Sequence, residues 1–175
     1  MRHTCAAVLA GAALLLGACG GGGDDSGSAP PPDGGAVTRE DYIARADAFC
    51  KRVNAQAKGL NGRMRDAARG ASSPGAQLAA IVPILEEGYR MQRRSRDEFK
   101  RIPYPPADRG IVERLYAAFD TQTELVGQLL RASEARDVGR VRALTREQNR
   151  VKLQARGLAQ GYGFKECGSG RNEAS

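Results

Sequence analysis

The sequence predicts an all-α domain: an antiparallel up-down-up-down four-helix bundle closed by one disulfide. Apolar residues recur at three- and four-residue intervals through four successive stretches, which is the spacing of the buried face of an amphipathic helix. Clusters of proline, glycine and helix-capping residues separate the stretches by short connections, so consecutive helices should lie antiparallel. Alanine, leucine, arginine, glutamate and glutamine dominate the composition, and these residues favour helix over sheet.

The first helix is predicted to begin after Thr38 and to run to about Arg69. Thr38 is a good N-cap, and Asp41 stands three residues later, where it can complete a capping box. Gly59 and Gly62 lower the helix propensity near the far end, and a break there is left open. The predicted inward residues follow a heptad spacing: Ile43, Ala46, Cys50, Val53, Ala57, Leu60 and Met64.

The second helix is predicted to begin with Ser73 as N-cap and Pro74 in the first helical position, where the missing N–H is harmless. Pro83 lies inside this stretch, and its ring removes one backbone hydrogen bond. Two outcomes are open: one helix that is kinked near Pro83, or two shorter helices that meet there. The predicted inward residues are Leu78, Ile81, Val82, Leu85, Tyr89, Phe99 and Ile102.

A proline-rich segment, residues 102–106, must be extended, because a residue that precedes proline avoids the α region. The third helix is predicted to follow over about 107–135. Its predicted inward residues are Ile111, Val112, Leu115, Phe119, Val126, Leu129 and Leu130.

The fourth helix is predicted to follow a very short connection at Arg136, with Asp137 as its N-cap. Gly161 and Gly163 mark its end, as glycines commonly do after the last helical turn. The predicted inward residues are Val141, Leu144, Gln148, Val151, Ala155, Leu158 and Tyr162.

The N-terminal residues have the parts of a secretory signal. Arg2 supplies a positive charge, residues 6–16 are apolar, and small residues lead up to Cys19. The apolar stretch is too short to span a membrane as a mature helix. With Cys19 directly after Ala18, the segment resembles a bacterial lipoprotein signal with its lipobox. The resemblance implies cleavage before Cys19 and a diacylglycerol thioether on its sulfur.

Four segments follow from this interpretation: a signal peptide over 1–18, a tether over 19–37, the bundle over 38–168 and a frayed tail over 169–175. The tether is rich in glycine, proline, serine and aspartate, a composition that cannot bury a core and is typical of disorder. We expect the protein at the extracytoplasmic face of the cell membrane, with diacylglycerol on Cys19 as its membrane contact.

The cysteines indicate one disulfide. Cys5 lies in the predicted signal and Cys19 would carry lipid, so Cys50 and Cys167 are left in an oxidising compartment. Antiparallel stacking at ~1.5 Å per residue also brings the end of the fourth helix within reach of Cys50. We therefore predict a Cys50–Cys167 disulfide, against the alternative of two free thiols.

The predicted domain is similar to a group of uncharacterised small exported lipoproteins, mostly actinobacterial. The likeness is carried by residues 46–50 (Ala-Asp-Ala-Phe-Cys) and 162–168 (Tyr-Gly-Phe-Lys-Glu-Cys-Gly), and the proline-rich break at 103–108 also fits. These motifs are structural, so the resemblance implies no catalytic residue.

Three glutamines occupy positions on the predicted inner faces: Gln92, Gln122 and Gln148. A bundle core prefers apolar residues there, so the glutamines have three interpretations. They form a polar pocket for a small ligand, they form a satisfied polar network that fixes helix register, or the helix face is rotated outward.

The predicted fourth helix also carries a basic face. The chain has a net charge of +7, and an anionic lipid or wall polymer would be attracted to such a surface. The alternative is a solvated face in an arginine-rich protein, and nucleic acid is a poor partner for an exported protein. The residues of the predicted basic face are Arg140, Arg142, Arg146, Arg150 and Arg156.

The single histidine, His3, lies in the predicted signal. The mature chain would therefore lack an imidazole for general-base catalysis or metal binding. The predicted domain has no hydrolase, metalloprotease or phosphate-loop motif, so we expect no catalytic residue, metal or cofactor. The favoured function is a non-catalytic binding or interaction module, with an unidentified envelope protein among its partners. A small-ligand carrier and an enzyme that uses carboxylates and arginines are the alternatives.

Overall fold

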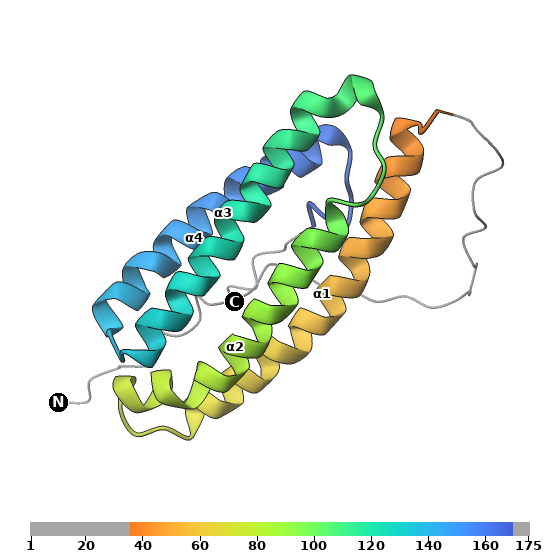
Figure 1. Ribbon diagram of the computed structural model, residues 1–175. Helices are drawn as coiled ribbons and strands as arrows, with labels where there is room; N and C mark the ends of the chain where they lie inside the picture. The colour runs from red at the N-terminus through yellow and green to blue at the C-terminus, as the bar shows by residue number, and fades with distance from the viewer. Residues whose placement is uncertain (1–35, 170–175) are drawn as a thin grey trace.

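The computed structural model describes residues 36–169. In this part of the chain it contains four long helices and one short 3₁₀ helix, which confirms the predicted all-α class. Consecutive helices pack against one another in an antiparallel bundle (Figure 1). The elements are α1 (Arg39–Arg69), α2 (Pro74–Phe99), η1 (Pro106–Asp108), α3 (Arg109–Glu134) and α4 (Val138–Tyr162).

The helix starts are those that the capping residues predict. The Thr38 hydroxyl accepts the Asp41 backbone N–H at 3.1 Å, and the Asp41 carboxylate accepts the Thr38 backbone N–H, which completes the capping box. Ser73 and Asp137 likewise accept backbone N–H groups of the first turns of α2 and α4. Local side-chain chemistry therefore fixes where these three helices begin.

The two helices whose continuity the sequence left open are both unbroken. α1 runs unbroken through Gly59 and Gly62, and α2 is one helix that contains Pro83. In Figure 1 the first turns of α2 are inclined to the rest of the helix, a bend of the kind that an internal proline produces. After the extended proline-rich segment, η1 precedes α3, which begins at Arg109 rather than near residue 107.

α1 and α4 differ from the other neighbouring helices. Within residues 36–169 they do not pack along their lengths as the consecutive pairs do. The chain after α4 crosses to α1 and is tied to it by the Cys50–Cys167 disulfide, which is present as predicted with an S–S distance of 2.06 Å. We call residues 163–169 the C-terminal strap. The bundle is thus closed on its α1–α4 side by the strap.

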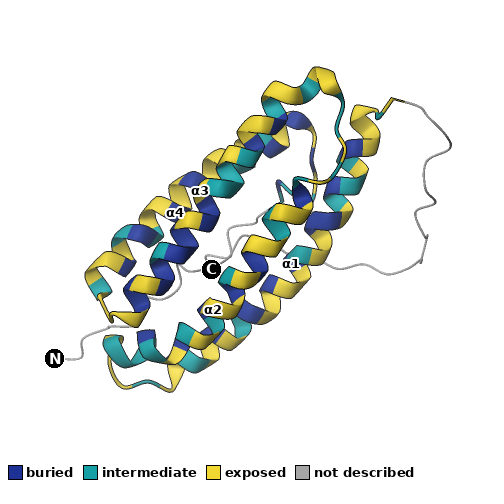
Figure 2. Ribbon diagram, in the orientation of Figure 1, coloured by how far each residue is buried: buried dark blue, intermediate teal, exposed yellow. Residues whose placement is uncertain are grey.

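The buried residues form two clusters, and Figure 2 shows the buried faces of the helices turned toward each other. One cluster is aliphatic. The other is aromatic and centres on Tyr42, which is fully buried; its ring centroid lies 5.6 Å from that of Phe164 and 5.8 Å from that of Tyr162. The few aromatic residues of the chain are therefore concentrated near the strap.

The predicted inner face of α1 is slightly misplaced around the helix. Ile43 and Val53 are only half-buried, whereas Tyr42, Phe49 and Asn54 are buried. The large aromatic side chains of α1 fill the space in front of the strap. The neighbouring aliphatic residues of the helix therefore lie at the edge of the core. No helix in the described range is long and apolar enough to cross a membrane.

Candidate ligand cavity

The strap begins at a glycine that ends α4. Gly163 has a left-handed backbone (φ 111°), a conformation that glycine adopts without strain. The backbone N–H groups of Gly163 and Phe164 both donate to the Ala159 carbonyl, at 3.2 and 3.0 Å. This turn directs the chain off the helix and buries the Phe164 side chain against the core.

One carboxylate of α1 holds the middle of the strap. Asp47 accepts the backbone N–H groups of Lys165 and Glu166 at 2.9 Å and that of Cys167 at 3.1 Å. Hydrogen bonds to an ionised acceptor are stronger than neutral ones. The strap backbone is thus fixed by a side chain that lies one helical turn before Cys50.

Further contacts hold the end of the strap. The Asn54 amide donates to the Glu166 carbonyl at 3.3 Å, and the Gln160 amide donates to the Gly168 carbonyl at 3.0 Å. Gly168 is buried, and a Cβ there would lie 2.8 Å from Gln160 Cγ. Ser169, predicted to begin the frayed tail, donates its hydroxyl to the Glu166 carbonyl at 2.9 Å. Residues 170–175 lie outside the described residues.

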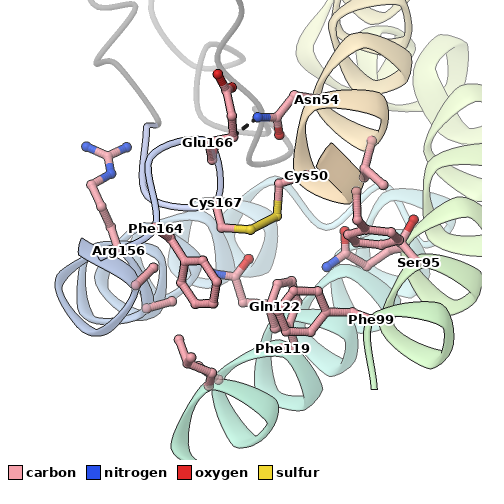
Figure 3. Close-up of a pocket in the computed structure, with 17 residues that line it drawn as sticks. Cys50, Asn54, Ser95, Phe99, Phe119, Gln122, Arg156, Phe164, Glu166 and Cys167 are labelled. Atoms are coloured by element: carbon pink, nitrogen blue, oxygen red, sulfur yellow. Dashed lines mark hydrogen bonds between the residues drawn. A yellow bond between two sulfur atoms is a disulfide. The ribbon is translucent and has the colours of Figure 1, made fainter. Parts of the chain in front are cut away.

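A cavity of about 70 Å³ lies beneath the strap, with lining residues from all four long helices. Its walls are mainly apolar and include the disulfide itself. Four phenylalanine rings contribute: Phe49, Phe99, Phe119 and Phe164. Polar side chains also reach the wall: Asn54, Gln92, Ser95 and Gln122. Figure 3 shows the Gln122 amide among the labelled rings, below the disulfide.

Gln122 carries an unused hydrogen-bond donor. Its side chain is 3% exposed, and its Nε2 atom has no hydrogen-bond partner among the described residues. Leaving such a buried group unpaired costs about 1–3 kcal/mol. A molecule in the cavity with an acceptor atom near Nε2 would remove this cost.

The three predicted glutamines are all buried, with exposed fractions of 9% for Gln92, 3% for Gln122 and 4% for Gln148. The outward-rotated face is therefore wrong. Gln122 Nε2 and Gln148 Oε1 have no protein partner within residues 36–169, so the three glutamines do not pair with one another in a closed network. Gln92 and Gln122 line the cavity, but Gln148 is not among its described lining residues, because it lies between Leu144 and Val151 in the aliphatic part of α4.

The predicted basic face needs one correction. Arg140, Arg142, Arg146 and Arg150 are exposed on α4, but Arg156 is half-buried and lines the cavity. Arg156 lies three residues before the buried Ala159, which places it at the flank of the inner face rather than on the outer one. Arg140 donates to Gln128 Oε1 at 3.0 Å.

The charged residues of the cavity lie at its rim. Arg156 and Glu166 are the described lining residues that carry charge. Figure 3 shows the guanidinium of Arg156 and the carboxylate of Glu166 directed away from Gln122. The Nε atom of Arg156 is nevertheless buried without a partner among the described residues, so the lining holds one buried cationic donor besides its neutral groups.

A charged cluster next to the aromatic core ties α1 to α4 through the start of α3. Arg39 donates to both carboxylate oxygens of Asp108, at 2.6 and 3.1 Å, and the Tyr162 hydroxyl donates to the same carboxylate at 2.6 Å. The hydrogen bond from Arg39 and then that from Tyr162 hold the pKa of Asp108 below its ordinary 3.8. Burial, and then the Asp108 contact, raise the pKa of Tyr162.

Sequence reasoning missed Asp47, Asn54 and Ser95. A polar residue in an amphipathic helix is normally assigned to the outer face, and none of the three stands at a predicted inward position. A usable signal for Asp47 was its place in the 46–50 segment beside Cys50, which the resemblance had already singled out. Cys19 and its predicted lipid lie outside the described residues.

The described residues contain no group of three or more histidine, cysteine, aspartate or glutamate side chains that could hold a metal ion. Comparisons with protein-family models, curated proteins and solved structures find no match to this chain. The function must therefore be inferred from the geometry of the cavity and the strap.

Proposed function

We propose that this chain is a lipid-anchored, extracytoplasmic, non-catalytic protein that binds a small ligand in the cavity beneath the strap. The unpartnered Nε2 of buried Gln122, in a cavity with mainly apolar walls, is the observation that carries the binding part. The anchor and the address rest on the signal-like N-terminus, on Cys19 and on the likeness to small exported lipoproteins.

The cavity costs stability if it is left empty. Protein interiors are close-packed, and at about 24 cal/mol per Å³ a cavity of about 70 Å³ costs roughly 2 kcal/mol. The cavity is present partly because three of its lining residues have small side chains, namely Ala118, Ala155 and Ala159. A larger apolar residue at any of these positions would reduce its volume. A bound ligand would recover both the packing and the hydrogen bond of Gln122.

The lining residues support binding rather than catalysis. A general acid or base must lie within hydrogen-bond reach of the reacting group, and the carboxylate of Glu166 points away from Gln122 and the rings (Figure 3). The two cavity sulfurs are joined in the disulfide. The described lining thus offers shape, apolar surface and hydrogen bonds.

Xenon tests whether the cavity admits guests. The full mature chain, purified in detergent, is studied by amide NMR under xenon pressure, because xenon enters apolar cavities without hydrogen bonding. Xenon-dependent shifts should centre on residues that line the cavity and should disappear in Ala118→Leu, which fills it. Ala117→Leu is the matched control, because Ala117 is exposed on the same helix. Absence of shifts in the parent protein, or their persistence in Ala118→Leu, would contradict the proposal.

The exposed arginines of α4 favour a second candidate, an interaction module for an anionic surface. Arg142 and Arg146 form no ion pair within residues 36–169, and Arg150 lies 3.6 Å from Glu147. A lipid anchor would hold such a face near headgroups or wall polymer. The two functions are compatible, because these three arginines do not line the cavity.

A further inference from the structure

We propose that the cavity selects a neutral, mainly apolar molecule that carries one hydrogen-bond acceptor oxygen, and that Gln122 Nε2 donates to this oxygen. The inference rests on the proposed ligand-binding function and names the class of ligand.

The apolar part of the ligand follows from the rings of the wall. Phe99 lies between two of them, with its ring centroid 4.8 Å from that of Phe119 and 5.6 Å from that of Phe49. Such a wall gains free energy by covering apolar surface and by dispersion contacts. A strongly hydrated ligand would lose hydrogen bonds to water there without replacement.

The requirement for an acceptor oxygen on the ligand follows from which hydrogen-bond donors around the cavity already have a partner. The strap N–H groups of Lys165, Glu166 and Cys167 donate to Asp47, and the Asn54 amide donates to the Glu166 carbonyl. Two lining donors, Gln122 Nε2 and Arg156 Nε, are buried and have no partner among the described residues. The guanidinium of Arg156 is directed away from Gln122, whose amide lies among the labelled rings (Figure 3). An acceptor placed against Nε2 therefore satisfies a donor that the fold leaves unpaired.

The neutrality of the ligand follows from the position of the two charged lining residues. An ionised group taken out of water needs a partner of opposite charge. Arg156 Nε is buried without a partner among the described residues, but the charged heads of Arg156 and Glu166 are both directed away from Gln122 (Figure 3). A carboxylate or an ammonium beside Gln122 would therefore keep its desolvation cost, whereas a carbonyl, ether or hydroxyl oxygen would not.

The size of the ligand follows from the volume. About 70 Å³ is roughly half of the ~150 Å³ of an apolar cavity that admits benzene. The cavity as built therefore suits a compact group of a few heavy atoms.

A matched pair of probes tests the inference: isobutene and acetone, two compact molecules of four heavy atoms each, of which only the second has an acceptor oxygen. Affinities are measured by amide NMR titration of the full mature chain. A neutral hydrogen bond of ordinary strength predicts about a threefold to tenfold preference for the ketone. Acetate, which has the same number of heavy atoms, should bind more weakly than acetone.

Two variants assign the preference to Gln122. Gln122→Met keeps an unbranched side chain but removes the donor, so it should bind isobutene at least as well as the parent does and should bind acetone no more tightly than isobutene. Gln148→Met makes the same change at a buried glutamine outside the described lining, and it should keep the preference.

The outcomes separate the two proposals. If neither isobutene nor acetone binds the parent chain, the ligand-binding function itself fails. If the two bind equally, or if the preference survives in Gln122→Met, binding stands but the acceptor rule is overturned. If acetate binds best, the neutral class is overturned.

Discussion

The carboxylate of Asp47 in α1 accepts the backbone N–H of Cys167 at 3.1 Å, across 120 positions of sequence. Cys167 is also joined to Cys50, one helical turn after Asp47. The non-covalent and covalent ties between α1 and the strap therefore act at the same place, directly above the cavity. The strap depends on both, and each can be removed separately.

Loss of the Asp47 carboxylate should loosen the strap while the disulfide stays intact. Asp47→Ala leaves three backbone N–H groups without their acceptor, and we expect a loss of about 1–3 kcal/mol in the free energy of unfolding measured with urea. Asp66→Ala is the matched control on the same helix; Asp66 pairs only locally with Arg69 in an exposed position, and its loss should be small. Equal effects of the two changes would contradict the role of Asp47.

Reduction of the disulfide should destabilise the whole bundle. The bridge spans a sequence separation of 117, for which loop entropy gives at most about 4–5 kcal/mol. Reductant should lower the melting temperature of the parent by several degrees and speed amide exchange in the strap. The variant with both Cys50→Ser and Cys167→Ser should already show these properties and not respond to reductant. Unchanged exchange in the strap after reduction would refute the account of its closure.

Acid should weaken the contact between Asp108 and Arg39. The pKa of Asp108 is lowered in the folded state, so its stabilising contribution is complete above the ordinary value of 3.8 and is lost as the pH falls through the folded-state pKa. NMR titration of the Asp108 carboxyl carbon should give a midpoint below 3.8, which rises in Arg39→Gln. Arg52→Gln removes an exposed ion pair with Glu98 and should leave the midpoint unchanged. A midpoint that Arg39→Gln does not move would contradict this contact.

The helix starts and the disulfide could be predicted from sequence because each depends on few residues. Thr38, Ser73 and Asp137 cap helices through groups two or three positions away. The disulfide was predicted because only Cys50 and Cys167 are left once Cys5 is assigned to the signal and Cys19 to the anchor, and because an exported protein is expected in an oxidising compartment. Such features need little knowledge of the rest of the fold.

The cavity could not be predicted in the same way. The cavity exists because α1 and α4 do not pack along their lengths and because the strap crosses between them. The heptad spacing of apolar residues predicts neither of these two features. Asn54 and Arg156 were misjudged for a related reason, since their polar character normally indicates an outer position. Gln92 and Gln122 were found because amides at inner positions are unusual, but only packing decides that Gln148 lies apart from them.

The proposed lipid anchor depends on Cys19 alone. Cys19→Ser should prevent lipidation, so the protein should be released to the medium or accumulate as an uncleaved precursor, as judged by detergent-phase partitioning and molecular mass. Cys5→Ser makes the same change inside the predicted signal and should leave processing intact. Partitioning of Cys19→Ser that matches the parent would contradict the anchor.

The exposed face of α4 should bind anionic membranes weakly and in a salt-dependent way. Each basic residue near such a surface contributes about 1 kcal/mol, so changing Arg142, Arg146 and Arg150 together to Gln should weaken binding of the unlipidated chain to phosphatidylglycerol vesicles by up to roughly 100-fold at low salt. The same triple change at Arg63, Arg65 and Arg69 of α1, which are also exposed, controls for net charge. Equal binding to phosphatidylglycerol and phosphatidylcholine vesicles would rule out the proposed surface.

The binding of a small acceptor ligand beneath the strap is tested most directly by a crystal structure of the protein soaked with acetone. We expect acetone among Phe49, Phe99, Phe119 and Phe164, with its carbonyl oxygen about 2.9 Å from Gln122 Nε2. Density for water alone beside Gln122 Nε2, or acetone bound only outside the cavity, would contradict the proposal.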